Sequence, residues 1–298
     1  MSLTAQSTES IAARAGWLET LQKSLPRGEF FAGLCLVGCA NGLGSHIIRS
    51  LSGGDWSGGL QDISAIVWFA CFVGISFLLR DKTDTIKIAD LAVGVVFVAL
   101  CAAPAAEVNW IAVTGLSLYI LLFTKDASGR MLLLAGDGST RRRGAVVMLA
   151  LTVPMLWSRL LFSFIAKVFL EIDATLVGWL LRTDRAGNVI RFADNSGDMV
   201  ILPACSSLAN VSLAFLCWVA VTQWVEHKRS REDILWCFLA CASVVAVNVT
   251  RIAIMGLSHW HYVTFHYGWG AVLTNAVILA LIVGFTVLGV RRELFPRA

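Results

Sequence analysis

The sequence is poor in charged residues. Of its 298 residues only 15% are Asp, Glu, Lys or Arg, whereas a soluble domain carries about 25%. Hydrophobic residues make up 57% of the chain, and its mean hydropathy is +0.73. This deficit of charge excludes an ordinary soluble protein and places the chain in a lipid bilayer.

Several signals of ligand binding or processing are also missing. The chain has no glycine-rich nucleotide-binding motif and no obvious repeat of about 20–50 residues, and none of its cysteine spacings is that of a zinc ribbon. The first apolar run begins only near Phe30, after a polar start, so we expect no cleavable signal peptide. We expect no cofactor and no nucleic-acid partner.

What the chain does have is a series of long apolar runs. A transmembrane helix needs about 20 mainly apolar residues, and eight segments approach or exceed this length: 30–49, 62–79, 88–104, 108–124, 144–170, 205–225, 233–256 and 269–290. We therefore predict an all-α polytopic membrane protein with a single transmembrane domain over residues 30–298. Residues 1–29 would form a tail. Its apolar residues at helical spacing between Ile11 and Leu25 fit a short interfacial helix or an ordinary tail equally well.

The positions of Lys and Arg orient the predicted bundle. Most of them flank the same set of helix ends, whereas few lie at the opposite ends. Examples on the richer side are Arg141 to Arg143, Lys228, Arg229, Arg231, Arg291, Arg292 and Arg297; the other side has Arg49, Arg182, Arg185 and Arg191. Because basic loops stay in the cytoplasm, we expect both termini to be cytoplasmic.

The longest polar stretch on the outer side, from Arg182 to Ala204, predicts a small β-hairpin. Residues 188–192 and 198–202 both have the composition of strands, and residues 194–197 (Asp-Asn-Ser-Gly) are a turn signal. The hairpin would lead directly into Cys205. Its exposed edge could pair with an extended peptide, or the hairpin could simply cover the bundle.

Among eight cysteines, Cys205 is the best candidate nucleophile. Most of the others lie deep in apolar runs, where cysteine behaves as a small hydrophobic residue. Pro203, Ser206 and Ser207 are typical of the start of a helix, whose dipole favours an anion and would lower the pKa of the thiol. A structural cysteine near a helix cap fits the same residues equally well.

Arg251 and His266 are the next candidates, each at the outer end of its own segment. An Arg inside a transmembrane helix costs about 2.5–3.5 kcal/mol on insertion scales, so it is expected to face protein or a wet cavity, although snorkelling to the interface is an alternative. Asn248 lies one turn earlier on the same helical face and could orient Arg251. His266 begins the last apolar segment and can exchange protons near neutral pH.

Two other functions use some of the same residues. His259, His261 and His266 share a loop and together could bind a metal in a membrane hydrolase, although no carboxylate accompanies them. Arg159, Arg251 and His266 could instead line the pathway of a transporter or channel. Arg159 lies in the middle of the fifth segment after Pro154 without an obvious local partner. Contact with substrate, or with a carbonyl that Pro154 leaves free, is a further alternative for it.

The motifs around these residues resemble the exosortase/archaeosortase family of membrane cysteine proteases. The likeness is carried by residues 203–208 (Pro-Ala-Cys-Ser-Ser-Leu), 248–252 (Asn-Val-Thr-Arg-Ile) and 266–270 (His-Tyr-Gly-Trp-Gly), and it covers about residues 145–290. His266 at the third catalytic position resembles the bacterial branch. Ser207 departs from the Gly that usually follows Cys-Ser in the family.

This resemblance implies a cysteine protease or transpeptidase in the bacterial inner membrane, with a periplasmic active site. Its catalytic residues would be Cys205, Arg251 and His266, supported by Asn248, Ser206 and Ser207. Its partners would be membrane-anchored proteins with a C-terminal sorting signal, which such enzymes cut near the outer face and transfer to an acceptor.

Overall fold

The computed structural model describes residues 25–52, 63–103, 105–126, 128–134, 138–202, 205–228 and 230–294. The chain forms two compact units. Unit 1 comprises Met1–Ser64 and Cys71–Leu149, and unit 2 comprises Ala65–Ala70 and Ala150–Ala298. The predicted interfacial helix of the tail lies outside the described residues.

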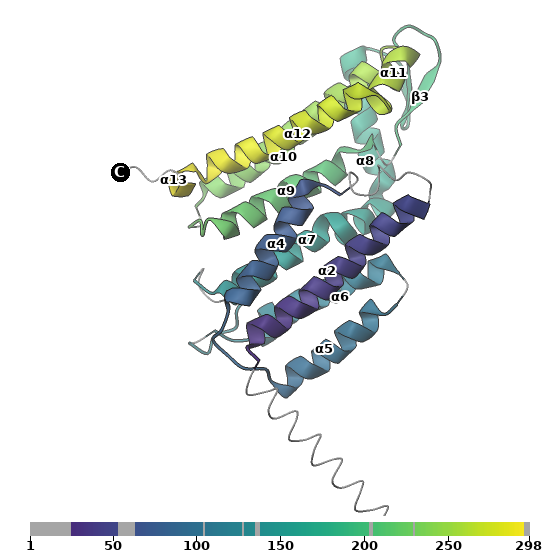
Figure 1. Cartoon of the computed structure of the whole chain (residues 1–298). Helices are drawn as coiled ribbons and strands as arrows, with labels where there is room; N and C mark the ends of the chain where they lie inside the picture. The colour runs from purple at the N-terminus through teal and green to yellow at the C-terminus, as the bar shows by residue number, and fades with distance from the viewer. Residues whose placement is uncertain are drawn as a thin grey trace, which may run out of the picture. The chain divides into compact units, whose positions relative to one another are not determined.

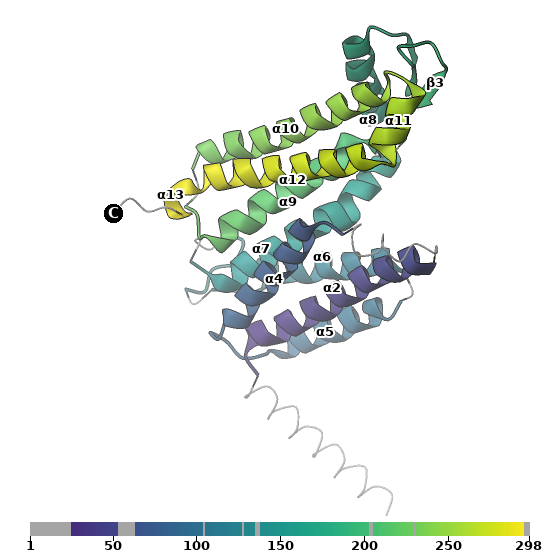
Figure 2. The same cartoon turned by 45° about the horizontal axis from the view of Figure 1, so that its top comes forward.

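The protein is mostly helical, and six helical stretches among the described residues are long and apolar enough to cross a membrane (Figures 1 and 2). These stretches lie in α2 (Arg27–Ser52), α6 (Ala106–Phe123), the combined α7 to α8, α9 (Ser207–Trp224), α10 (Glu232–Met255) and α12 (Trp269–Gly289). Two short helices, α11 (His259–His266) and α13 (Arg291–Leu294), flank α12 in the chain.

The predicted count of eight spans is not confirmed, because two of the expected segments form shorter helices. The helix α4 covers Ala65–Arg80 (16 residues) and α5 covers Ile88–Cys101 (14 residues). At 1.5 Å per residue they are about 24 and 21 Å long, short of the roughly 30 Å hydrocarbon core. Polar contacts explain where they stop and start: Asp81, directly after α4, binds Arg141, and Asp90 in the first turn of α5 accepts a hydrogen bond from the amide of Lys87.

Buried ion pairs tie the helices of unit 1 together. Arg27 in α2 donates to Asp90 in α5 over 2.6 Å, and the Tyr119 hydroxyl of α6 donates to the same carboxylate over 2.8 Å. Arg141 at the start of α7 (Thr140–Thr152) donates to Asp81 and Asp84 beyond the end of α4. Each buried cation in these two clusters therefore has a carboxylate partner.

A single helical stretch runs from Thr140 to Leu181, well past the predicted end at residue 170. It consists of α7, a π-helical turn at Val153–Trp157 (η1) and α8 (Ser158–Leu181). The π-helical turn contains Pro154, which cannot donate to the helical ladder, and a second break in the helical angles occurs at Ile165. The stretch continues beyond residue 170 because Leu170, Ala174 and Val177 bury one helical face in the core of unit 2.

The predicted hairpin is present, with one strand more than expected. Strands β1 (Arg185–Ala186), β2 (Val189–Arg191) and β3 (Asp198–Val200) form an antiparallel sheet in the order β1-β2-β3. In the turn before β3, Asn195 and Gly197 both have positive φ, as the turn signal indicated. Met199 pairs with Ile190, and both side chains are buried.

The core of unit 2 joins this sheet to the helix ends that carry the candidate site. Its buried residues come from α8, the sheet region, the segment leading into α9, and α10: Leu170, Ala174, Val177, Ile190, Phe192, Met199, Ile201, Cys205, Val249, Ile252, Ala253 and Met255. Tyr262 and Phe265 of α11 pack against it. The sheet is therefore a packed part of the unit rather than a loose loop.

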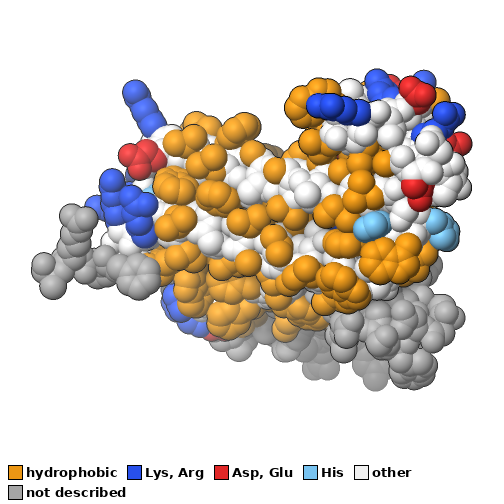
Figure 3. Space-filling view, turned by 90° about the horizontal axis from the view of Figure 1, so that it is seen from above, with side chains coloured by type: hydrophobic (Ala, Val, Ile, Leu, Met, Phe, Trp, Pro, Cys, Tyr) orange, Lys and Arg blue, Asp and Glu red, His pale blue; other side chains and the backbone are white. Residues whose placement is uncertain are grey.

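The two ends of unit 2 differ in their side chains. One end carries Arg291 and Arg292 of α13 close to Lys228, in a small depression that also contains His227 and Glu293. The face drawn in Figure 3 shows a wide band of hydrophobic side chains between two ends that both carry charged side chains, and the larger histidine patches lie at one of these ends. Charged ends around an apolar band are typical of a membrane-spanning bundle.

Candidate active site

Cys205 lies just before α9, at the point where the chain leaves the sheet. Its amide donates to the carbonyl of Leu202 over 2.9 Å, and Ser206 is the N-cap residue of α9. The Ser206 hydroxyl accepts from the amide of Leu208, which is the standard contact of a serine cap. The thiol is thus near the helix N-terminus, as predicted, but outside its first turn.

The structure brings Cys205 and His266 together, although 61 residues separate them in the sequence. The sulfur lies 3.7 Å from the Nδ1 atom of His266, the last residue of α11. The imidazole stacks on the ring of Tyr262 at 5.1 Å and meets the ring of Tyr267 edge-on at 4.3 Å. These two aromatic rings fix the orientation of the imidazole toward the thiol.

Arg251 contributes a cation to the same place. Its Nε donates to the carbonyl of Phe265 over 3.0 Å, so the residue preceding His266 holds the guanidinium. The charge is close enough to lower the pKa of both Cys205 and His266. Among the described residues the two terminal amino groups of Arg251 have no hydrogen-bond partner, and they remain able to donate to a ligand.

The resting thiol is not the anion that the sequence predicted. Burial raises the pKa of Cys205 above its ordinary value, and this effect outweighs the opposite effect of Arg251. Burial, aided by the charge of Arg251, lowers the pKa of His266. The expectation of a lowered thiol pKa was wrong because Cys205 is 8% exposed and lies outside the first turn of α9. At neutral pH the site therefore holds a neutral thiol beside a neutral imidazole.

Asn248 does not orient Arg251, contrary to the sequence interpretation. Its side-chain amide donates instead to the carbonyl of Cys205 over 2.8 Å and to the hydroxyl of Ser207 over 3.0 Å. Asn248 is 1% exposed, so these bonds form in a nearly water-free interior. It therefore fixes the backbone at the thiol-bearing residue, while the carbonyl of Phe265 orients Arg251.

Sequence reasoning missed Asp173, a buried carboxylate of α8. It accepts from the Ser207 hydroxyl over 3.2 Å and from the Ser207 amide over 3.4 Å, and it is only 4% exposed. Asp173 therefore accepts a hydrogen bond from the first backbone amide of α9 and anchors that helix to α8. An acid in an apolar helical pattern is the signal that identifies it, but the predicted helix ended at residue 170.

Arg159 does not belong to this cluster. It is exposed, and it lies 14 positions before Asp173 on α8, or about 21 Å along a helix. Among the described residues it has no hydrogen-bond or ion-pair partner. A pathway lined jointly by Arg159, Arg251 and His266 therefore receives no support from this arrangement.

The three histidines of the predicted loop do not converge on one point. His259 packs against the rings of Phe192 and Tyr262, and Nδ1 of His261 lies 2.8 Å from the hydroxyl of Ser258. In the part of the chain that the structure describes, no group of three or more His, Cys, Asp or Glu side chains could hold a metal ion.

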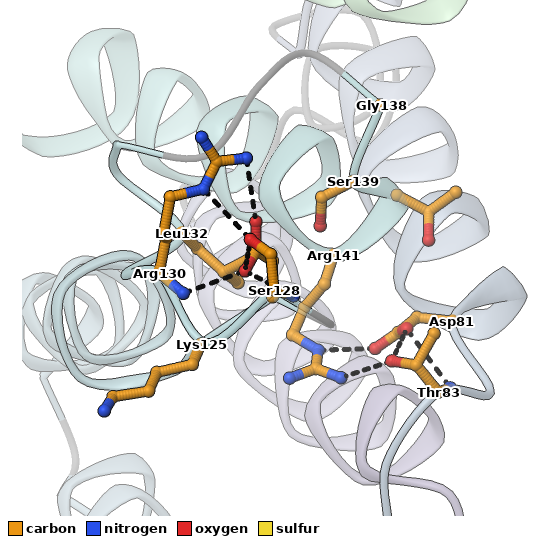
Figure 4. A pocket seen from close by; sticks show the side chains of 11 residues that line it. Asp81, Thr83, Lys125, Ser128, Arg130, Leu132, Gly138, Ser139 and Arg141 are labelled. Carbon is orange, nitrogen blue, oxygen red and sulfur yellow. Dashed lines mark hydrogen bonds and ion pairs between the residues drawn. The ribbon is translucent and has the colours of Figure 1, made fainter.

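A separate polar cavity of about 380 Å³ lies in unit 1, beside the start of α7 (Figure 4). Asp81 and Thr83 on its wall bind Arg141, and Asp126 accepts from the hydroxyl of Ser128 and the amide of Arg130. Its acids are thus satisfied by neighbouring donors, which indicates a structural role for these contacts.

No family model, no curated protein and no solved structure matches the chain.

Proposed function

We propose that the protein is a membrane-embedded cysteine protease or transpeptidase resembling the exosortases. It would span the bacterial inner membrane about eight times, with α4 and α5 as two short spans. Both termini would lie in the cytoplasm and the site of Cys205 on the periplasmic side. Its substrates would be exported proteins held by a C-terminal sorting signal and a transmembrane helix. The observation that carries this proposal is the contact between Cys205 and His266 next to an Arg251 that lacks a carboxylate partner among the described residues.

The first half-reaction begins with a neutral pair. His266 accepts the thiol proton as the sulfur attacks the scissile carbonyl carbon, forming a C–S bond and an oxyanion. Arg251 donates its unused N–H groups to that oxyanion in a poorly solvated site, where such a contact is strong. His266 then gives the proton to the leaving amine as the C–N bond breaks, which leaves a thioacyl enzyme.

The second half-reaction releases the substrate. An acceptor nucleophile or water attacks the thioacyl carbonyl, and His266 takes its proton. The C–S bond breaks, and the proton returns to the sulfur. Asn248 and Asp173 do not touch the reacting atoms in this scheme. They hold the backbone of Cys205 and Ser207 in place, since both bonds of Asn248 and both bonds of Asp173 end on these two residues.

The proposed orientation is supported by unit 2 itself. The basic end with Lys228, Arg291 and Arg292 would face the cytoplasm. Cys205, at the other end of α9 from Trp224, would then face the periplasm. Labelling of single introduced cysteines with a membrane-impermeant thiol reagent would test this orientation.

The proposed activity can be tested before any substrate has been identified. The C-terminal peptides of membrane and exported proteins are compared by mass spectrometry between strains that carry the native chain and Cys205→Ala. We expect a set of proteins to keep their C-terminal helix only in the variant. Cys217→Ala is the matched control, because Cys217 is also buried on α9 but contacts only Thr286 among the described polar groups. Identical C-termini in the native and Cys205→Ala strains would refute the proposal.

A further inference from the structure

The sheet beside the site has an open edge. Because the strand order is β1-β2-β3, β3 pairs with β2 on one side only. The amide of Ile201 donates to Asn188, and the amide of Phe192 donates to Gly197, so residues 197, 199 and 201 direct their main-chain groups toward β2. By the alternation of an antiparallel ladder, Asp198 and Val200 direct theirs away from the sheet.

These outward groups are not satisfied elsewhere. Among the described residues, no hydrogen bond joins the outward main-chain groups of Asp198 or Val200 to another part of the protein, and both residues are exposed. A row of unpaired amides and carbonyls at a strand edge is a template for another extended chain. A helix or a compact loop cannot match its spacing, since its own amides are already used.

The edge leads directly to the nucleophile. Val200 is followed by Ile201 and Leu202, and the carbonyl of Leu202 accepts from the amide of Cys205. Met199 and Ile201 are buried in the same core as Cys205, so the strand and the thiol are held by one packed cluster. Figures 1 and 2 both place β3 at the end of unit 2 where α11 lies, and His266 is the last residue of α11.

We propose that the substrate binds as an extended segment that adds to the free edge of β3, with its main chain bonded to Asp198 and Val200 and its scissile carbonyl next to Cys205. This inference rests on the proposed function. A substrate that descends from the periplasm into the membrane runs in the same direction as β3, which goes from the turn at residues 194–197 toward α9. The added strand is therefore parallel to β3.

The side chains of the edge indicate which residues the segment presents. Val200 is 48% exposed and Leu202 is 46% exposed, so apolar substrate side chains fit nearest the cleavage point. Further from that point, Asp198 and Arg191 form an exposed ion pair of 3.8 Å. Polar substrate side chains fit there. The recognised sequence is thus an extended run that becomes apolar toward the scissile bond, with main-chain bonds supplying much of the affinity.

Proline substitution tests the edge while leaving the ladder to β2 intact. Val200→Pro removes only an outward-facing amide, a position at which an edge strand tolerates proline. Val200→Ala removes the exposed side chain but keeps the amide, and Asp198→Pro is a second edge variant. The readout is the fraction of uncleaved C-termini for the proteins that differ between the native and Cys205→Ala strains.

We expect cleavage to fall about tenfold in Val200→Pro and Asp198→Pro, and less than about threefold in Val200→Ala. Alkylation of Cys205 by iodoacetamide at the native rate would show that the site is intact in each variant. Native cleavage by both proline variants would overturn the edge proposal and leave the proposed function standing. Identical C-termini in the native and Cys205→Ala strains would refute both the edge proposal and the proposed function.

Discussion

Both units bury arginine among apolar helices, but they treat the charge differently. In unit 1, Arg27 and Arg141 are each 2% exposed, and both meet carboxylates. In unit 2, the half-buried Arg251 meets only the carbonyl of Phe265 among the described groups, and the Cys205–His266 pair beside it is neutral. A cation paired with a carboxylate holds helices together, whereas a cation without a carboxylate partner can stabilise a negative charge that forms during a reaction.

The same contrast applies to the buried acids. Asp90 in unit 1 accepts from Arg27, Tyr119 and Lys87, so its charge is fully compensated. Asp173 in unit 2 accepts from Ser207, and its charge acts on Cys205, whose pKa it raises. Substitutions in the charge-compensated ion-pair clusters of unit 1 are therefore expected to change stability strongly. Substitutions around Cys205 in unit 2 are expected to change the reactivity of the thiol.

The largest expected effect comes from removing the carboxylate of a buried ion pair in unit 1. Asp90→Ala would leave the Arg27 guanidinium buried without its carboxylate, which costs about 3–5 kcal/mol. Thermal unfolding in detergent, followed by the fluorescence of the 11 tryptophans, would show a much lower midpoint. Asp126→Ala is the control, because Asp126 pairs with Arg130 in an exposed loop and should cost little. Equal unfolding midpoints for the two variants would show that the buried ion pair of Asp90 contributes no more to stability than the exposed pair of Asp126.

The next effect falls on activity rather than stability. Arg251→Met removes the cation that has no carboxylate partner among the described residues, so the unfolding midpoint should stay the same or rise. Cleavage should fall about 10²- to 10³-fold, the usual loss of an oxyanion donor. Arg251→Lys should also be impaired, because an ammonium does not reproduce the guanidinium fork.

The pH dependence of thiol alkylation would check the same residue independently. Arg251 lowers the pKa of Cys205, so Arg251→Met should move the alkylation profile to higher pH. If Arg251→Met lowers the unfolding midpoint but cleaves at the native rate, Arg251 has a structural role and does not stabilise the oxyanion.

The sequence predicted the parts of this site that depend on local patterns. The turn residues 194–197 identified the hairpin, and the cap residues Ser206 and Ser207 identified the start of α9. The sequence placed Cys205, Arg251 and His266 at the corresponding ends of three apolar segments, and the structure brings Cys205 to His266 and Arg251 to the residue before His266. Each of these inferences uses only neighbours in the chain or the side of the membrane.

The parts that failed depend on contacts between distant segments. Whether Asn248 turns toward Arg251 or toward Cys205 is decided by the packing of α10 against α9, which no spacing reveals. The pKa of Cys205 depends on its burial, and the lengths of α4 and α5 depend on the partners of Asp81 and Asp90 in other helices. Asp173 was missed because helix α8 is prolonged by its packing on the sheet.

A smaller effect is expected from removing the charge at Asp173 while keeping its shape. Asp173→Asn keeps an oxygen that can accept from Ser207, so the start of α9 should stay in place. Because the native carboxylate raises the pKa of Cys205, its removal should lower that pKa and speed alkylation at a fixed pH below it.

Asp173→Ala separates charge from anchoring. This variant loses both contacts to Ser207, so it should also lower the unfolding midpoint, whereas Asp173→Asn should change it little. The rate at Cys205 is read from its own peptide by mass spectrometry. Slower or unchanged alkylation in Asp173→Asn would show that the carboxylate acts only as an anchor.

The smallest effect concerns the end of unit 2 away from the site. His227 lies 2.8 Å from Asp233 and 2.8 Å from Glu293, and it links the loop before α10 to α13. Burial opposes protonation, but the two carboxylates outweigh it and raise the pKa of His227. A raised pKa means that the folded protein binds the proton more tightly than the unfolded chain does.

The sign of the pH effect follows from this direction. The stabilisation is complete below the unfolded pKa of about 6.5 and is lost as the pH rises through the higher folded value. The unfolding midpoint of the native protein should therefore fall modestly as the pH is raised from about 6. His227→Gln should flatten this part of the profile without changing the alkylation of Cys205, because the two groups lie at opposite ends of α9. A pH profile unchanged by His227→Gln would show that the carboxylates do not hold a charged imidazole. That result would remove the contrast between His227, which is paired with carboxylates at one end of unit 2, and Arg251, which has no carboxylate partner among the described residues at the other end.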